Sequence, residues 1–288
     1  MSRSNAVKKP DQVSITPQRM GFTFDDAPRY WCRNDPVLTH FLNALSLTFP
    51  DGERFFVDAV RAFRDTVTDP QRQKDISGFI GQEAMHSLEH DTFNQMLASQ
   101  GYQEEAEGGQ KLARYLINEG RKRLSKEQQL AATAALEHIT AILANRLLKD
   151  PSLLADMHPS VRQLWMWHAI EEIEHKAVAY DLYQDVVGSY RMRVRTLLAA
   201  TLALGSYTSK YTWAFLKKDG MHRRPLVLAR GLWRLFGING MLTRTLPDFI
   251  SFLRPDFHPW QEDNSALIEA WRAQLTAIEN GEATQTPA

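Results

Sequence analysis

The chain has 288 residues, 43% of them hydrophobic, and its 34 lysines and arginines balance 34 aspartates and glutamates. This composition supplies a sizeable core, and the zero net charge gives no reason to expect a nucleic-acid partner. The single cysteine, Cys32, excludes an intrachain disulfide and suits a cytoplasmic protein with a buried thiol.

The two ends of the chain are polar. Residues 1–21 carry mixed charges and lack the apolar run of a secretory signal, so we expect a disordered tail there and a second tail at 279–288. Between the tails, strand signals are scarce and long amphipathic segments dominate, which predicts an all-α protein.

The first two thirds of the chain predict a series of helices. Asp69 before Pro70 marks one helix start, and Ser125 with Gln128 forms a capping box at another. We expect an acidic loop at 104–109. The predicted helices cover approximately 35–49, 50–63, 70–99, 111–123, 125–148 and 158–187.

The remaining third is more hydrophobic. Residues 196–216 form the most apolar run, flanked by basic residues and interrupted by serine, threonine and lysine. This run can contact a membrane surface peripherally, or it can pack on the preceding helices or in a homodimer interface. We expect residues 22–187 to form one bundle, with the helices of 188–278 packed on it.

Polar residues interrupt the apolar stripes of four predicted helices. Two of the helices carry a glutamate and a histidine three positions apart, a spacing that places both side chains on one helix face. In chain order the interrupting residues are Glu53, the pair Glu83 and His86, then Glu137, and the pair Glu172 and His175. The order suggests a duplicated two-helix unit.

Four carboxylates buried together repel one another and are costly to desolvate, and no lysine or arginine lies on these stripes to pair with them. Two divalent metal ions would neutralise them. An oxygen-rich ligand set with one imidazole per metal suits iron best, with manganese or zinc as alternatives. The sequence therefore predicts a ferritin-like four-helix bundle that carries a di-metal site. Glu137 is expected to bridge the metals together with Glu83 or Glu172.

Neighbouring polar residues extend this set. His90 lies one turn beyond His86 and is a candidate extra ligand or proton carrier, and His168 flanks the second pair as a candidate catalytic proton acceptor. Glu171 competes with Glu172 as a ligand. Three residues are expected to lie away from the site, the first two in solvent: Glu89, Glu174 and His138.

The motifs Gly81-Gln82-Glu83-x-x-His86-x-x-x-His90 and Glu171-Glu172-x-Glu174-His175 resemble those of the bacterial predicted metal-dependent hydrolase family. The resemblance extends over about 31–271, and Pro255-x-Phe257-His258-Pro259-Trp260 fits it. It implies a bound metal and hydrolysis. The ligand pattern is also similar to that of ferritin-like di-iron oxygenases and oxidases.

Three functions follow as hypotheses. The first is O2-dependent oxidation of a small apolar substrate by two iron ions. The second is hydrolysis of an apolar or acyl substrate, in which the metals polarise it and lower the pKa of a bound water. The third is a non-catalytic metal-binding protein.

Overall fold

The structure, a computed structural model, describes residues 7–280. The described chain is helical without any strand, apart from one isolated bridge between Cys32 and Met157, which confirms the all-α prediction. The α-helices are α1 (Pro36–Ser46), α2 (Phe49–Arg61), α3 (Pro70–Leu97), α4 (Gln103–Arg123), α5 (Lys126–Leu148), α6 (Pro151–Ala155), α7 (Pro159–His175), α8 (Val178–Val186), α9 (Tyr190–Lys218), α10 (Pro225–Phe236), α11 (Leu246–Ser251) and α12 (Ser265–Glu279). Short helical turns are η1 (Arg64–Thr66), η2 (Ala98–Tyr102), η3 (Met221–Arg223), η4 (Thr243–Thr245) and η5 (Pro259–Gln261).

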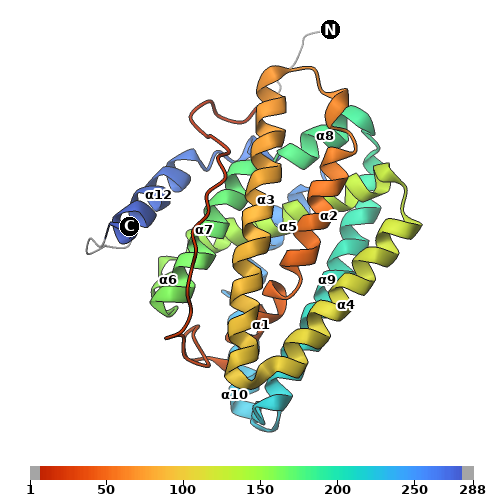
Figure 1. The fold of residues 1–288 in the computed structure, drawn as a ribbon. Helices are drawn as coiled ribbons and strands as arrows, with labels where there is room; N and C mark the ends of the chain where they lie inside the picture. Colours follow the sequence, from red (N-terminus) through yellow and green to blue (C-terminus); the bar gives the residue numbers. More distant parts are fainter. Residues whose placement is uncertain (1–6, 281–288) are drawn as a thin grey trace.

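The centre of the molecule is a bundle of α2, α3, α5 and α7. Helix α2 packs against α3 and α5, and α7 packs against the same two helices, so the four close into a ring (Figure 1). This confirms the predicted four-helix bundle. Each of the four helices contributes at least one of the predicted ligands, and the ring brings those ligands to a common interior.

Several helices begin where the sequence supplies a side-chain cap. The side chain of Asp35 accepts hydrogen bonds from two backbone N–H groups of α1, and Asp69 accepts one at the start of α3. Ser125 and Gln128 form the predicted capping box of α5. These caps satisfy backbone donors that would otherwise lack partners, and so they set where each helix starts.

The predicted acidic loop at 104–109 is wrong, because these residues form the first turns of α4. Gly101, with a φ of 93°, makes the turn out of α3 and η2, so α4 begins directly after it. Glu104 and Glu105 then lie in the first turn, where the helix dipole favours negative charge. Gly109 lies within the helix, where α4 packs so closely that a Cβ at this position would lie 2.5 Å from Leu47.

The predicted helix over 158–187 is interrupted. Helix α7 ends at His175, and α8 begins at Val178. The ammonium group of Lys176, in the break, donates hydrogen bonds to the Glu262 carbonyl and the Asn264 side chain, and it lies 4.0 Å from the Trp260 ring centroid. The break therefore directs one polar side chain outward into the C-terminal segment immediately after the last predicted ligand.

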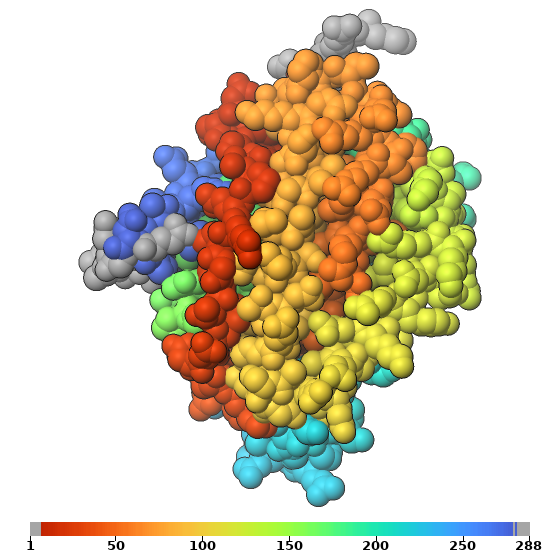
Figure 2. Space-filling view, in the orientation of Figure 1, coloured from red at the N-terminus to blue at the C-terminus, as the bar shows by residue number. Residues whose placement is uncertain are grey.

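The expected N-terminal tail differs from what its described part shows. Residues 7–21 run along α3, with Val13 and Ile15 buried (Figures 1 and 2). Two glycines of α3 permit this approach, because a Cβ at Gly78 would lie 2.3 Å from the Ile15 carbonyl oxygen and one at Gly81 would lie 2.2 Å from Pro17. Residues 1–6 of this tail, and 281–288 of the other, lie outside the described residues.

The later helices pack on the bundle. Helix α9 contacts α1 and α5, α10 contacts α1, and α12 contacts α7. Among the described residues, no helix is both long enough and apolar enough to cross a membrane. The apolar run at 196–216 belongs to α9, whose inner residues, such as Leu197 and Phe215, are buried in the core.

Candidate metal centre

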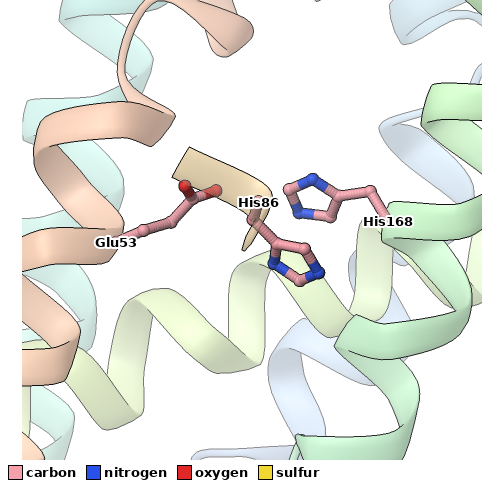
Figure 3. A group of neighbouring side chains, drawn as sticks. All are labelled: Glu53, His86 and His168. Atoms are coloured by element: carbon pink, nitrogen blue, oxygen red, sulfur yellow. The ribbon is translucent and has the colours of Figure 1, made fainter. Parts of the chain in front are cut away.

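The six predicted ligands meet inside the bundle. Glu53 comes from α2, Glu83 and His86 from α3, Glu137 from α5, and the pair Glu172 and His175 from α7. All six are at most 3% exposed. Five of the six belong to two groups whose possible ligand atoms lie within 4.8 Å of one another: Glu53 and His86 together with His168, and Glu83 with Glu172 and His175. Figure 3 shows the first group, whose side chains point toward one another from three helices.

Two carboxylates lie between the two imidazoles. Glu83 Oε1 is 3.5 Å from His86 Nδ1 and 3.3 Å from His175 Nε2. Glu172 Oε1 is 3.6 Å from each of the same two nitrogens. Glu137 Oε2 lies 3.4 Å from His175 Nε2 only. Glu83 and Glu172 therefore lie between the two imidazoles, and Glu137 lies beside His175 at one end of the cluster.

Each of the two imidazoles, His86 and His175, makes a hydrogen bond through the ring nitrogen that faces away from the cluster. His175 Nδ1 lies 3.0 Å from Gln82 Oε1, an acceptor, so this nitrogen carries the proton and Nε2 presents its lone pair to the cluster. His86 Nε2 lies 3.1 Å from Glu171 Oε2 and donates to it, which leaves Nδ1 toward the cluster. Glu171 therefore orients His86 instead of competing with Glu172. Outer hydrogen bonds of this kind are typical of metal-binding histidines.

Two predictions of solvated carboxylates are wrong. Glu174 is buried, accepts a hydrogen bond from Gln82 Nε2 at 2.9 Å, and is paired with Arg272. Glu89 is also buried, and it accepts hydrogen bonds from the backbone N–H groups of residues 20–22 at 2.7–3.2 Å. Both lie on the outward side of their helices. Arg272, later in the chain, covers Glu174, and residues 20–22, earlier in the chain, cover Glu89. His138 lies off the site, as expected, and contacts the Asp248 carbonyl.

A chain of polar contacts leaves the cluster through His168. Its Nε2 is 3.0 Å from Glu172 Oε1, its Nδ1 is 2.7 Å from His90 Nε2, and His90 Nδ1 is 2.8 Å from Ser46 Oγ. Ser46 Oγ donates to Asn94 Oδ1 at 2.8 Å. His90 and His168 were predicted beside the site, whereas Ser46 and Asn94 were not. Ser46 lies on α1, which carries no predicted ligand, and Asn94 lies on α3 one turn beyond His90.

This series of four polar contacts has one proton too few. Glu172 and Asn94 Oδ1 can only accept, while the serine hydroxyl and two neutral imidazoles supply three protons for the four contacts. Burial and neighbouring imidazoles lower the pKa of His168 to about 4 and that of His90 well below its usual value, so neither ring takes the extra proton. One of the four contacts therefore has no hydrogen, and His168 Nε2, 3.0 Å from Glu172 Oε1, stands at the end of the series nearest the ligands.

The buried carboxylates likewise lack enough positive charge around them. Burial raises the pKa values of Glu53, Glu83 and Glu137 well above the ordinary value, and neighbouring carboxylates raise them further. Burial opposes the charge of His86, but Glu171 and the other carboxylates outweigh it and raise its pKa to about 9. Burial raises the pKa of Glu172, but its contacts with His168 and His175 hold it well below the usual range.

The ligand atoms themselves fit a metal site. Unbonded buried atoms are rare in folded proteins, and here they gather at the cluster. The atoms without hydrogen-bond partners include both oxygens of Glu53, Glu83 and Glu137, Oε2 of Glu172, Nδ1 of His86 and Nε2 of His175. Four carboxylates and two imidazoles match the ligand set of di-iron and di-manganese bundles, so the residues present fit two divalent cations.

Comparison with known proteins assigns a family. The family described as "Predicted metal-dependent hydrolase" matches residues 16–263, which include every residue of the cluster. No curated protein and no solved structure matches this chain significantly. The match spans most of the sequence. It agrees with the buried group of carboxylate and imidazole atoms that could hold metal ions. The chain therefore belongs to the family of predicted metal-dependent hydrolases.

Proposed function

We propose that this protein is a dinuclear metal hydrolase that acts on a small apolar acyl compound, such as an ester. The observation that carries the proposal is the buried cluster of carboxylate and imidazole atoms that lack hydrogen-bond partners. Family membership supports hydrolysis as the reaction class. Two divalent cations held there would supply Lewis acidity toward a substrate oxygen and lower the pKa of a coordinated water.

The proposed ligands divide between the two ends of the cluster. Glu53 and His86 would hold one cation and Glu137 and His175 the other, with Glu83 and Glu172 shared between them. Because Gln82 and Glu171 already hold the outer nitrogens of the two imidazoles, the rings need no reorientation to present their inner nitrogens.

His168 is the proposed proton acceptor. In the neutral tautomer that this role requires, Nδ1 carries the proton and Nε2, 3.0 Å from Glu172 Oε1, carries the lone pair. Nδ1 contacts His90, which contacts Ser46. A proton taken up at Nε2 can be balanced by transfer of the Nδ1 proton toward His90. We assign the accepting role to His168 and the relaying role to His90, which lies one contact farther from the ligands.

An apolar cavity supports the substrate class. Phe49, Leu143 and Trp165 contribute to its lining, and so do His168 and Glu172. Its volume is about 50 Å³, and its other lining residues are apolar apart from Thr140. Such a cavity favours a hydrocarbon group over a charged one, because burying an unpaired charge there is costly. A short acyl chain in this cavity would place its carbonyl group at the cluster.

O2-dependent oxidation of an apolar substrate by two iron ions is the second candidate. The specific observation that favours it is the ligand set: oxygen donors dominate, with one imidazole at each end, as in di-iron carboxylate bundles. The same apolar cavity would then hold the group to be oxidised. Iron is the preferred metal for this reaction, whereas manganese or zinc would also serve hydrolysis.

One experiment separates the two candidates. The protein is purified without O2, its metals are counted by elemental analysis, and it is then exposed in parallel to O2 and to p-nitrophenyl esters of increasing chain length. Ester cleavage that needs the metals, with no spectral response to O2, supports hydrolysis. Two irons and an O2-driven ferric absorption band without ester cleavage would overturn hydrolysis in favour of oxidation.

The His168→Gln variant tests the proton acceptor. We expect the variant to keep both metals and lose ester cleavage by about a hundredfold or more. The matched control is His138→Gln, a buried histidine that lies off the site and contacts the Asp248 carbonyl. Loss of a metal from His168→Gln, with both retained in the control, would instead show that His168 is a ligand.

A further inference from the structure

Large apolar side chains are exposed along α10 and the turn that follows it. We call residues 217–238 the α10 tip. Leu226 is 84% exposed, Trp233 65%, Phe236 60% and Ile238 80%. Single exposed apolar residues are ordinary on protein surfaces, but four within 13 consecutive positions are not. The tip forms one end of the molecule, at the bottom of Figures 1 and 2, where residues around 215–235 are cyan.

The exposed face of α10 is not the face that packs on the bundle. Helix α10 already uses its other face against α1: Leu235 is buried, and Gly231 approaches so closely that a Cβ there would lie 2.3 Å from Val37. Arg234 is paired with Asp35 at the start of α1. The helix is therefore held in place from one side and presents Leu226, Trp233 and Phe236 on the other.

Cations surround these apolar residues. Arg223, Arg224 and Arg230 are exposed and form no ion pair with any described residue. The only acidic residue of the tip is Asp219, whose side chain is 1% exposed and is occupied by Arg29 and His40. Lys218 faces Glu104 and Glu105 of α4 at 3.7 and 3.8 Å, so its charge is partly compensated. The three arginines leave a net positive surface beside the apolar one.

The geometry points to a membrane surface as the occupant: we propose that the α10 tip docks on an anionic lipid bilayer. Aromatic and aliphatic side chains can enter the headgroup boundary while arginines contact anionic headgroups, as in interfacial amphipathic helices. Docking at the surface is consistent with the absence, in the described chain, of a helix able to span the bilayer.

A second copy of the chain is a poorer occupant. A two-fold symmetric contact through this tip would bring the same patch of both copies together. The arginines of both copies would then lie in one interface, and the tip offers no exposed carboxylate to pair with them. An anionic bilayer complements both the apolar and the cationic parts of the surface, and it does so whatever reaction the metal site performs.

The test is co-sedimentation of the full chain with vesicles of phosphatidylcholine alone or of phosphatidylcholine mixed with phosphatidylglycerol. One variant, Trp233→Ser/Phe236→Ser, removes apolar contact, and another, Arg223→Glu/Arg224→Glu, reverses charge. Matched controls on α4 and α5 are Tyr115→Ser/Leu116→Ser, at residues 58% and 47% exposed, and Lys122→Glu/Lys126→Glu. Thermal unfolding and gel filtration of every variant establish that it is folded and report its oligomeric state.

We expect binding to the anionic vesicles that weakens with salt, and about tenfold or greater weakening in each tip variant but not in the controls. Equal binding to the neutral vesicles, or equal loss in the controls, would overturn the proposal. So would a dimer in lipid-free buffer that the Trp233→Ser/Phe236→Ser variant converts to a monomer, because the tip would then be a contact between copies.

Discussion

At the scale of single residues, the site is defined by how each imidazole is held. His175 and His86 each use one ring nitrogen to bond a protein acceptor and leave the other among carboxylates. The outer partners differ: an amide oxygen in one case and the carboxylate of Glu171 in the other. A carboxylate partner makes an imidazole a stronger donor to a metal, so the two ends of the cluster are chemically unequal.

The first prediction concerns Glu137. In the metal-loaded protein, Glu137→Ala should reduce the bound metal from two equivalents to one or none, because it removes a carboxylate beside His175. In the metal-free protein the same change should cost little stability or increase it, because a buried carboxylate with a raised pKa is lost. Elemental analysis and thermal unfolding with and without metal measure both effects.

The matched control is Glu127→Ala on the same helix. Glu127 lies in the exposed first turn of α5, where it is available to the helix dipole but remote from the cluster. The control should keep two metals and lose at most about 1 kcal/mol of stability. Unchanged metal content in Glu137→Ala would remove Glu137 from the proposed ligand set.

Residue spacing predicted which side chains share a helix face, and the structure brings those six together. It could not predict contacts between helices. Gln82 and Glu174 belong to adjacent helices and meet only after folding, so neither showed its role in the sequence. Glu89 was expected in solvent because nothing in α3 indicates that residues 20–22 will cover it.

At the scale of helices, α3 is the scaffold of the site. It contributes Glu83 and His86 to the interior and accepts the N-terminal segment on its outer surface at Gly78 and Gly81. Glycine is a poor helix former, so its presence within α3 has a cost. The close approach of Ile15 and Pro17 explains why larger residues would not fit there.

The second prediction uses this close approach. Gly78→Ala should destabilise the protein by about 1–3 kcal/mol, because its Cβ would meet the backbone carbonyl of Ile15, which cannot rotate away. Gly205→Ala in α9 should stabilise it by about 0.5–1 kcal/mol, because its Cβ would have no neighbour within 4 Å. Chemical denaturation of both variants gives the free energies. Equal stabilisation would mean that the N-terminal segment is not seated on α3.

Helix capping signals predicted the starts of α3 and α5 well, because Asp69 and Ser125 act within their own segments. The limits of α4 and α7 depended on other parts of the chain. Helix α4 packs its Gly109 against Leu47, and α7 ends where Lys176 turns toward Asn264. Neither partner is close in sequence.

At the scale of the whole molecule, Asp219 joins distant segments. It lies at the end of α9, accepts hydrogen bonds from Tyr30 and Tyr102 at 3.0 and 2.6 Å, and contacts His40 Nε2 at 2.9 Å. Burial lowers the pKa of His40, so its contact with Asp219 is a hydrogen bond from a neutral ring at neutral pH. The Asn43 side chain lies 3.3 Å from the other ring nitrogen, Nδ1, which suits this tautomer.

The third prediction is the pH dependence of this junction. Burial raises the pKa of Asp219, but hydrogen bonds from His40 and Tyr102 outweigh it and hold the pKa below 3.8. A carboxylate with a depressed pKa stabilises the fold above its unfolded-state pKa, and that contribution is lost as pH falls through the folded-state value. Asp219→Asn should therefore cost about 2 kcal/mol at neutral pH, with the difference shrinking below about pH 4.

Denaturation of the wild type and Asp219→Asn across the acidic range measures this difference. Asp65→Asn is the control, because Asp65 is exposed and lies in a short turn after α2. A stability difference that stays constant down to the acid limit would show that the Asp219 charge does not hold the segments together.

The net charge of zero does not show how acidic and basic residues are distributed over the fold. Glu53, Glu83, Glu137 and Glu172 are buried inside the bundle, while Arg223, Arg224 and Arg230 are exposed at the α10 tip. Composition could exclude a generally basic surface, but the exposure of Arg223, Arg224 and Arg230 beside exposed aromatic residues comes from the fold.

The most direct test of the central claim is an anomalous difference map from crystals of the protein loaded with Mn²⁺. Two peaks should lie inside the ring of α2, α3, α5 and α7, one beside Glu53 and His86 and the other beside Glu137 and His175. A map from the folded, metal-loaded protein with no peak among these residues, or with peaks only elsewhere, would contradict the assignment of a two-metal centre.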